Sequence, residues 1–173
     1  MQTYFSVVGY GSSGKTTLIR KLVKELRTRG YKIAVVKHDP GEHGAVDKEG
    51  SDTSLFWEAG SEAVILASPS RLTLFKRTEK DLMVEEILPF CGDVDCVILE
   101  GYKGRLYPRV VLWSEEGGPE LPGATVLAIV YKKEDEQKVR RETQDKHVPL
   151  ISRDDIKELA DLLETTLLRD STL

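Results

Sequence analysis

Eight consecutive residues near the start of the sequence have the types and spacing of a phosphate-binding loop. They match G-x-x-x-x-G-K-[ST] at every fixed position and are Gly9, Tyr10, Gly11, Ser12, Ser13, Gly14, Lys15 and Thr16. Glycines let a backbone turn so that several N–H groups close around a phosphate. The lysine brings a mobile charge to the β and γ phosphates, and the threonine hydroxyl is suited to Mg²⁺. We therefore expect a nucleoside triphosphate with Mg²⁺ to bind here.

The residues on either side of this loop support the same interpretation. The apolar run 4–8 stops at Gly9, and apolar residues then recur at helical spacing from Thr16 to Arg29. A helix that begins at the loop adds unpaired N–H groups and the positive end of its dipole. We expect the backbone from Gly11 to Thr17 to hold the phosphates.

Two carboxylates are candidates for holding the metal ion or a water. Glu100 follows the apolar run Val97–Leu99, and Asp39 follows Val35 and Val36 after two further residues. In a parallel sheet the ends of both runs lie on the edge where the phosphate loop opens. Either carboxylate is therefore a candidate catalytic residue beside Lys15, and for each the alternative is an ordinary solvated carboxylate.

A charged segment after the apolar run 125–130 has one feature of a guanine-binding site. Lys133 and Asp135 have the K-x-D spacing of that site, with lysine packing along the base and aspartate accepting from its N–H groups. Lys132 stands where asparagine or threonine is expected. A charged loop that opens a helix is the alternative interpretation.

The rest of the sequence alternates between strand and helix patterns. Strands are predicted over 4–8, 33–36, 63–67, 72–76, 94–99, 109–113, 125–130 and 148–151, and helices over 16–29, 53–59, 80–88 and from a Ser152 cap to about 168. This order predicts an α/β fold of the P-loop class, in three layers, with a mainly parallel sheet flanked by helices and some antiparallel strands. The polar segment 39–52 is long for a connection and is expected to be functional.

Length and composition limit the classes of protein that remain. The chain has 173 residues and a formal net charge of -4, which fits one domain over 1–173 and gives no electrostatic basis for binding nucleic acid. No apolar stretch reaches the roughly 20 residues that span a bilayer. No basic and apolar leader precedes the first strand, so a cytoplasmic protein without membrane contact is expected.

Several segments, taken in order, resemble the MobB family of molybdopterin-guanine dinucleotide biosynthesis adapter proteins over nearly the full chain. The segments are the loop with Thr16 and Thr17, then V-K-H-D at 36–39, D-K-E-G-S-D-T at 47–53, E-A-G-S-E-A at 58–63 and E-G-Y-K at 100–103. Ser51 and Arg109 stand where members of the family often carry lysine. Tyr10 takes the place of the signature lysine of partition-type ATPases, so activation by a facing subunit's lysine is not expected.

The resemblance implies a GTP-binding homodimer in the last steps of molybdenum cofactor synthesis. Such proteins assist a separate guanylyltransferase that joins GMP to molybdopterin, and they are weak GTPases at most. If the protein is such an adapter, we expect the loop 47–53 to meet the pterin or the partner. Lys103 and Arg109 are then candidates to contact the terminal phosphate of the pterin, and for both the alternative is an ordinary solvated cation.

Two other functions are compatible with the same loop. A P-loop small-molecule kinase needs an arginine-bearing lid, for which Arg140 and Arg141 are the candidates. An interaction module that binds nucleotide without turnover needs the same phosphate-binding residues as the adapter. Turnover and phosphoryl transfer distinguish the three.

Overall fold

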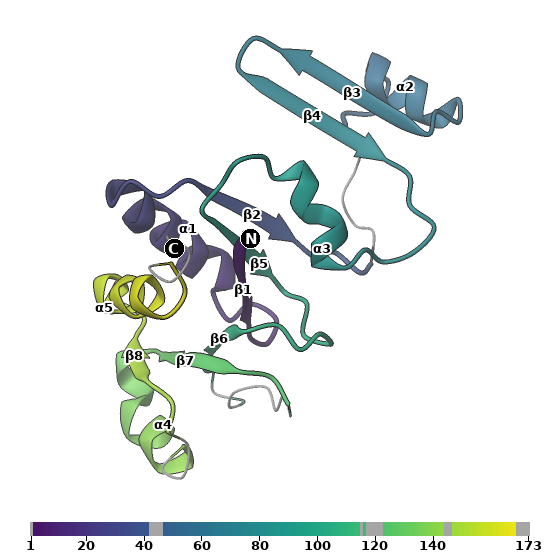
Figure 1. The fold of residues 1–173 in the computed structure, drawn as a ribbon. Helices are drawn as coiled ribbons and strands as arrows, with labels where there is room; N and C mark the ends of the chain where they lie inside the picture. Colours follow the sequence, from purple (N-terminus) through teal and green to yellow (C-terminus); the bar gives the residue numbers. More distant parts are fainter. Residues whose placement is uncertain (1, 42–46, 115, 117–122, 144–146, 169–173) are drawn as a thin grey trace. The chain divides into compact units, whose positions relative to one another are not determined.

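In the computed structural model, six apolar segments form one entirely parallel sheet (Figure 1). Its strands are β1 (Thr3–Val8), β2 (Ile33–Lys37), β5 (Cys96–Glu100), β6 (Arg109–Leu112), β7 (Val126–Tyr131) and β8 (Leu150–Ser152). They lie in the order β2-β5-β1-β6-β7-β8, and each neighbouring pair is parallel. Because parallel strands all end on one edge, the segments that follow them gather there.

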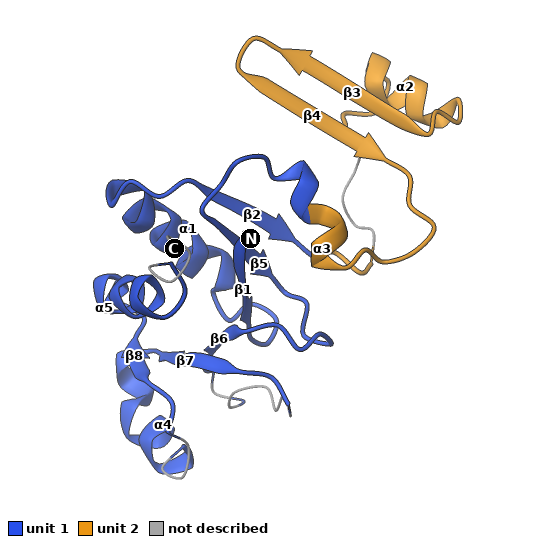
Figure 2. Ribbon diagram, in the orientation of Figure 1, with its two compact units in different colours: residues 1–38, 88–173 blue, residues 39–87 orange. Residues whose placement is uncertain are grey.

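The structure describes residues 2–41, 47–114, 116, 123–143 and 147–168. They form two compact units, one of residues 1–38 and 88–173 and one of residues 39–87 (Figure 2). The first unit carries the phosphate loop and the parallel sheet, and the second carries an antiparallel strand pair. One domain over 1–173 stays a prediction.

Helices cover both faces of the parallel sheet. Successive side chains of a strand point to opposite faces. One set of buried residues, including Val7, Ile98 and Val110, packs with α1 (Lys15–Thr28) and α5 (Ile156–Leu163). The alternate set, including Val8 and Val111, packs with α4 (Glu136–Glu142). This three-layer arrangement confirms the predicted fold class.

The closing helix begins later than the sequence pattern predicts. Ser152 is the last residue of β8, and the helix begins at Ile156 after Asp155, whose carboxylate accepts the Glu158 N–H at 3.1 Å. Asp155 is therefore the cap, because its side chain supplies the acceptor that the first turn lacks. The helix continues as a π-helical turn, Glu164–Leu168. No helix in the described part of the chain is long and apolar enough to cross a bilayer.

The second unit is built on a hairpin and a short helix. The strands β3 (Ala63–Ser68) and β4 (Arg71–Lys76) are antiparallel and meet at the predicted turn, and α2 (Asp52–Glu58) precedes them. Arg77 joins hairpin to helix: its guanidinium lies 4.0 Å from the centre of the Trp57 ring and donates to the Trp57 carbonyl at 2.6 Å.

The segment before α2 is ordered by its own side chains. Ser51 caps the helix by accepting the Ser54 N–H at 3.3 Å, and Thr53 donates to the Asp47 carboxylate. The Thr53 hydroxyl and the Lys48 N–H stabilise the charged form and lower the pKa of Asp47. Residues 42–46 of the predicted polar segment lie outside the described residues.

The hairpin leaves apolar side chains exposed on one face. The register pairs Ile65 with Leu74 and Ala67 with Leu72, so these residues point to the same side. Ile65 is 61% exposed and Leu72 is 69% exposed, whereas Val64 on the opposite side is buried. We call the exposed side, formed by Ile65, Leu72 and Leu74, the hairpin apolar face.

The helix predicted over 80–88 is much shorter. α3 covers only Val84–Ile87, and a 3₁₀ turn, Leu88–Phe90, follows it. Glu86 accepts the Met83 N–H at 2.9 Å and pairs with Lys80 at 2.8 Å. This pattern caps the helix just before Val84, and Pro89 prevents its continuation.

One arginine ties α1 to α5 in the first unit. The Arg29 guanidinium is 19% exposed and contacts Glu25 at 3.0 Å, Asp161 at 2.6 Å and Glu164 at 2.9 Å. The Tyr31 hydroxyl donates to the other oxygen of Glu164 at 2.9 Å. Partial burial alone would lower the pKa of Arg29, but the hydrogen bonds to the three carboxylates raise it. Removing the cation leaves three carboxylates close together.

We expect Arg29→Ala to lower the free energy of unfolding by about 1–3 kcal/mol, because Glu25 and Glu164 lose a partly buried cation. Chemical denaturation measures this loss. The matched control is Arg140→Ala, which removes an exposed pair with Glu136 on α4 and is expected to cost much less, because water screens that pair. Equal losses in the two variants would contradict the role of Arg29.

Candidate functional site

A turn of six residues, from Gly9 to Gly14, joins β1 to α1. Ser12 and Gly14 have positive φ angles of 56° and 93°. A Cβ on Gly9 would lie 2.7 Å from Ser13 Oγ and 3.2 Å from the Leu112 carbonyl oxygen of β6. The turn therefore needs glycine at position 9 for close packing and at position 14 for its backbone angles.

The predicted phosphate-binding lysine lies folded over its own loop. Lys15 Nζ donates to the Tyr10 carbonyl at 2.7 Å and to the Gly9 carbonyl at 3.3 Å. Burial lowers the pKa of Lys15, the charge of Lys103 lowers it further, and Glu100 opposes the shift. Two cations and one carboxylate thus lie close to this loop, and the excess of positive charge favours the arrival of an anion.

The structure brings Thr16 and Glu100 together, although 84 residues separate them in sequence. Thr16 Oγ1 donates to Glu100 Oε1 at 2.9 Å. The contact arises because β5 pairs with β1 in parallel and places Glu100 opposite Val7, next to the loop. A hydroxyl and a carboxylate are hard oxygen donors of the kind that Mg²⁺ takes, with phosphate oxygens and waters completing its six ligands. This donor set fits the predicted metal.

The other metal candidate belongs to the second unit. Asp39 follows His38 directly, and His38 donates its N–H to the Glu100 carbonyl at 3.0 Å at the end of β2. The part of Asp39 in metal binding stays a prediction.

The predicted base-recognition residues follow β7, at the same edge of the sheet as the phosphate loop. Lys133–Asp135 forms a 3₁₀ turn, and the Asp135 N–H donates to the Lys132 carbonyl at 2.8 Å. Asp135 Oδ2 is buried and accepts no hydrogen bond from the described residues. Since β6 alone separates β7 from β1, the turn and the phosphate loop lie two strands apart. An acceptor without a partner there is compatible with an N–H donor on a ligand.

The segment after Glu100 places an aromatic residue, Tyr102, and a cation, Lys103, next to the phosphate loop. Lys103 Nζ lies 5.3 Å from the centre of the Tyr10 ring. Tyr102, nearly buried and with a φ of 57°, stacks on His38 with ring centres 4.4 Å apart. Lys103 is thereby associated with the phosphate loop itself, as the shift in the Lys15 pKa also indicates.

Arg109 is buried and supports the segment that follows Tyr102 and Lys103. Its side chain is fully buried, Nε donates to the Tyr107 carbonyl at 3.2 Å, and Nη2 donates to the Arg105 carbonyl. Nη1 has no hydrogen-bond partner among the described residues. Burial lowers the pKa of Arg109, because the charged guanidinium loses its hydration. The structure thus assigns Arg109 a role in holding residues 105–107, and its predicted contact with a ligand phosphate stays a prediction.

The structure places one further cation at the loop that the sequence analysis missed. Arg153, just after β8, packs against Gly14: its Cζ lies 3.6 Å from the position of a Cβ on Gly14, and Nη2 would clash with that atom. The available signal was its place after a parallel strand, at the edge where the phosphate loop opens. The predicted lid residue Arg140 instead pairs with Glu136 within α4 at 3.0 Å.

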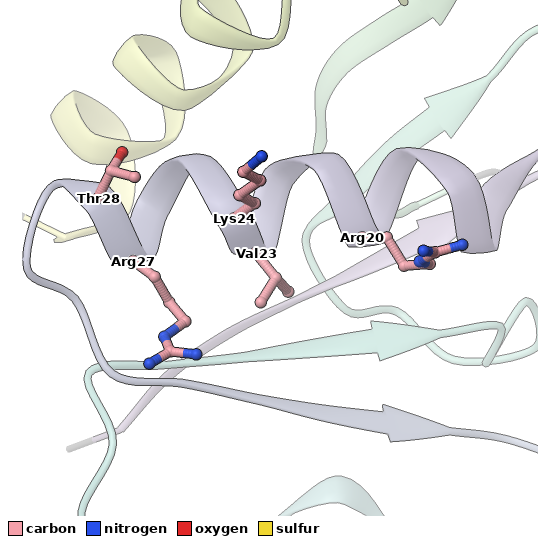
Figure 3. Close-up of a pocket in the computed structure, with 5 residues that line it drawn as sticks. All are labelled: Arg20, Val23, Lys24, Arg27 and Thr28. Carbon is pink, nitrogen blue, oxygen red and sulfur yellow. The ribbon is translucent and has the colours of Figure 1, made fainter.

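A separate pocket lies along α1. Figure 3 shows its lining, which consists of Arg20, Val23, Lys24, Arg27 and Thr28. These residues lie about one to three helical turns beyond Thr16. The loop residues from Gly9 to Thr16 do not line this pocket, so it is distinct from the candidate nucleotide site.

The parallel sheet and its loop define a protein with the fold of the P-loop nucleoside triphosphatases. A family model described as molybdopterin guanine dinucleotide synthesis protein B, MobB, matches residues 4–132. The chain belongs to the MobB family.

Relatives and solved structures agree with this assignment. The molybdopterin-guanine dinucleotide biosynthesis adapter protein of Haemophilus influenzae is 36% identical over 67% of this chain, and the match spans 66% of that protein, just under two thirds of its length. A Bacillus subtilis relative is 31% identical over 86% of this chain and 84% of its own. The crystal structure of Bacillus subtilis MobB superimposes with a TM-score of 0.74 and 27% identity, over 95% of this chain and 98% of that one.

We expect Gly9→Ala and Gly14→Ala each to lower the free energy of unfolding of the nucleotide-free protein by about 1–3 kcal/mol. At Gly9 the added methyl meets β6 backbone, and at Gly14 it is held at a φ of 93°. Thermal and chemical denaturation of the free protein measure the change.

The matched control is Gly11→Ala. A Cβ on Gly11 would meet no atom within 4 Å. This variant is expected to be neutral or to gain less than about 1 kcal/mol, because alanine restricts the unfolded chain. A loss at Gly11 equal to that at Gly9 and Gly14 would refute the geometry described for the turn.

Proposed function

We propose that this protein is a GTP-binding adapter of molybdenum cofactor biosynthesis in the cytoplasm. It assists a guanylyltransferase that attaches GMP to molybdopterin and so forms molybdopterin guanine dinucleotide. Membership of the MobB family supports the pathway, and the geometry of the phosphate loop supports the nucleotide.

The observation that carries the proposal is the contact between Thr16 and Glu100 beside Lys15. A helix N-terminus, an ammonium and an oxygen pair suited to Mg²⁺ converge at one edge of the parallel sheet. In the proposed complex Lys15 and the N–H groups from Gly11 to Thr17 hold the phosphates, and Thr16 with Glu100 or Asp39 holds Mg²⁺. The ion supplies neutralisation of the phosphate charge.

The choice of guanine rests on the turn after β7. The buried Asp135 carboxylate oxygen without a described partner supports its assignment to the N–H groups of guanine, with Lys133 along the base. Adenine lacks the paired N–H donors that a carboxylate accepts. The proposed preference is therefore for GTP over ATP.

Hydrolysis has a minor part in the proposed function. Lys15, Thr16 and Glu100 are assigned to phosphate and metal, and a strong triphosphatase also needs a group that positions the attacking water. The main proposed role is to present GTP or hold the cofactor while the guanylyltransferase acts. Lys103 is the proposed contact for a terminal phosphate, because its ammonium lies at the loop.

We expect the wild-type protein to bind GTP with Mg²⁺ at least about tenfold more tightly than ATP, because a charged acceptor that is left unpaired costs roughly 1–3 kcal/mol. Lys15→Ala is expected to abolish binding of both nucleotides. Isothermal titration calorimetry gives the affinities, and Asp135→Asn is expected to remove the preference.

The adapter role is tested by reconstitution with a molybdopterin guanylyltransferase, GTP and molybdopterin. Wild-type protein is expected to raise the yield of the dinucleotide, and Lys15→Ala is expected not to. Tighter binding of ATP would remove the guanine assignment. Transfer of phosphate to a small acceptor, with no effect on the guanylyltransferase, would point to the kinase instead.

The hairpin apolar face supports the proposed homodimer. A two-stranded hairpin is marginal by itself, and an exposed cluster such as Ile65, Leu72 and Leu74 is characteristic of an interface. A second copy of the chain supplies the same face, which suits a two-fold symmetric contact.

We expect Leu72→Lys to shift the protein from dimer to monomer, because a buried charge in the interface lacks a partner. Sedimentation velocity measures the mass. Ser70→Lys, which adds the same charge in the exposed hairpin turn, is the control and is expected to remain dimeric. A dimer that persists in Leu72→Lys would place the interface elsewhere.

A further inference from the structure

Arg153 is fixed between two parts of the candidate nucleotide site. Its backbone N–H donates to the carbonyl of Tyr131, the last residue of β7, at 2.7 Å. Tyr131 precedes the turn that carries Lys133 and Asp135. From this anchor the side chain extends to the phosphate loop, where the guanidinium packs on Gly14. One residue therefore spans the distance between the proposed base-binding turn and the loop.

The Arg153 guanidinium carries N–H donors that the residues described in the structure do not use. Within the described residues it makes no hydrogen bond and no ion pair, although the neighbouring Asp154 pairs with Lys21 and Asp155 caps α5. Arginine presents five N–H donors in a planar fork that matches two oxygens of a phosphate. A half-buried guanidinium with free donors, in contact with a phosphate-binding loop, is in position to bind an anion in that loop.

The order of the strands indicates which end of the nucleotide Arg153 meets. Glu100 and Lys103 come from the β5 side of β1, and Glu100 carries the proposed metal contact. Arg153 approaches from the opposite side, because β8 and β7 lie beyond β6. The metal and Lys15 belong to the β and γ phosphates. The side of β7 and β8 is therefore the nucleoside side of the loop.

We propose that Arg153 is a phosphate-binding residue of this site, which donates hydrogen bonds to the phosphate chain on the nucleoside side, in GDP and GTP alike. The proposal rests on the proposed nucleotide-binding function and adds to it a residue beyond the 4–132 segment that the family model matches. It also accounts for Gly14: any larger side chain there would displace the guanidinium from the loop.

The test measures the affinity of Mg²⁺-GDP and Mg²⁺-GTP by calorimetry for wild type, Arg153→Ala, Arg153→Lys and Lys15→Ala. Arg153→Ala is expected to raise both dissociation constants by about tenfold or more, and by the same factor, because it removes a charge-assisted contact to a group that both nucleotides share. Arg153→Lys keeps a point charge but loses the fork, so it is expected to recover part of the affinity. Arg27→Ala, an exposed arginine at the far end of α1, is the matched control and is expected to bind as wild type does.

The melting temperature of the nucleotide-free protein shows whether Arg153 binds the nucleotide or instead stabilises the fold. It is expected to be unchanged in Arg153→Ala, because the backbone bond to Tyr131 remains and the side chain loses no hydrogen bond or ion pair with the described residues. A lowered melting temperature with unchanged affinities would make Arg153 a structural residue and overturn the inference. Wild-type affinity in Arg153→Ala, or a loss for GTP alone, would also overturn it. If wild type itself binds neither nucleotide, the proposed function fails and the inference fails with it, whereas loss in Lys15→Ala but not in Arg153→Ala removes the inference alone.

Discussion

The turn between β1 and α1 is the constraint on which the first unit depends. Two residues with left-handed backbone, Ser12 and Gly14, reverse the chain within six residues, and Gly9 lets the loop lie against β6. So short a turn forces α1 to run back across the sheet that β1 belongs to. The apolar stripe of α1, which includes Leu18 and Leu22, is then buried on that sheet, and α5 packs beside it. The tight turn therefore shapes the phosphate loop and also places α1 where its apolar side chains enter the core.

The charges around the loop are arranged for an anion that arrives from outside. Burial and the nearby charge of Lys103 lower the pKa of Lys15, whose ammonium donates to two backbone carbonyls of its own loop. The Arg109 guanidinium donates to the backbone carbonyls of Tyr107 and Arg105. The hydrogen-bond acceptors of Lys15 and Arg109 are backbone carbonyls, which carry only partial negative charge, and Glu100 is the carboxylate whose charge acts on Lys15. A phosphate chain in the loop would give Lys15 a full negative charge that its backbone carbonyl partners do not supply.

Local patterns in the sequence were sufficient to predict the strands and to locate the phosphate loop. Apolar runs of four to six residues predicted the strands, and G-x-x-x-x-G-K-T located the turn, because both depend only on neighbours in the chain. For contacts across the sheet, the sequence predicted which edge a residue lies on but not which residue it contacts. The end of β5 was correctly expected near the loop, but the bond from Thr16 to Glu100 needs the strand order. Arg153 was missed because its backbone is fixed by Tyr131, 22 positions away. The starts of α3 and α5 were misplaced because carboxylates at Glu86 and Asp155, and not the apolar period, decide where those helices begin.

The strand order decides where a shortened version of this chain can end. The segment by which the family is recognised ends at 132, just past β7. A chain ending there would lack β8 and α5, so β7 would become an open sheet edge and the α1 surface that Leu159 and Leu163 cover would face water. The recognisable segment and the folding unit are therefore different lengths of chain. An expression boundary, a swapped chimera or a split reporter that ends at residue 132 would remove β8 and α5 from the folding unit. The protein would then be destabilised, even though every residue of the phosphate loop would be retained.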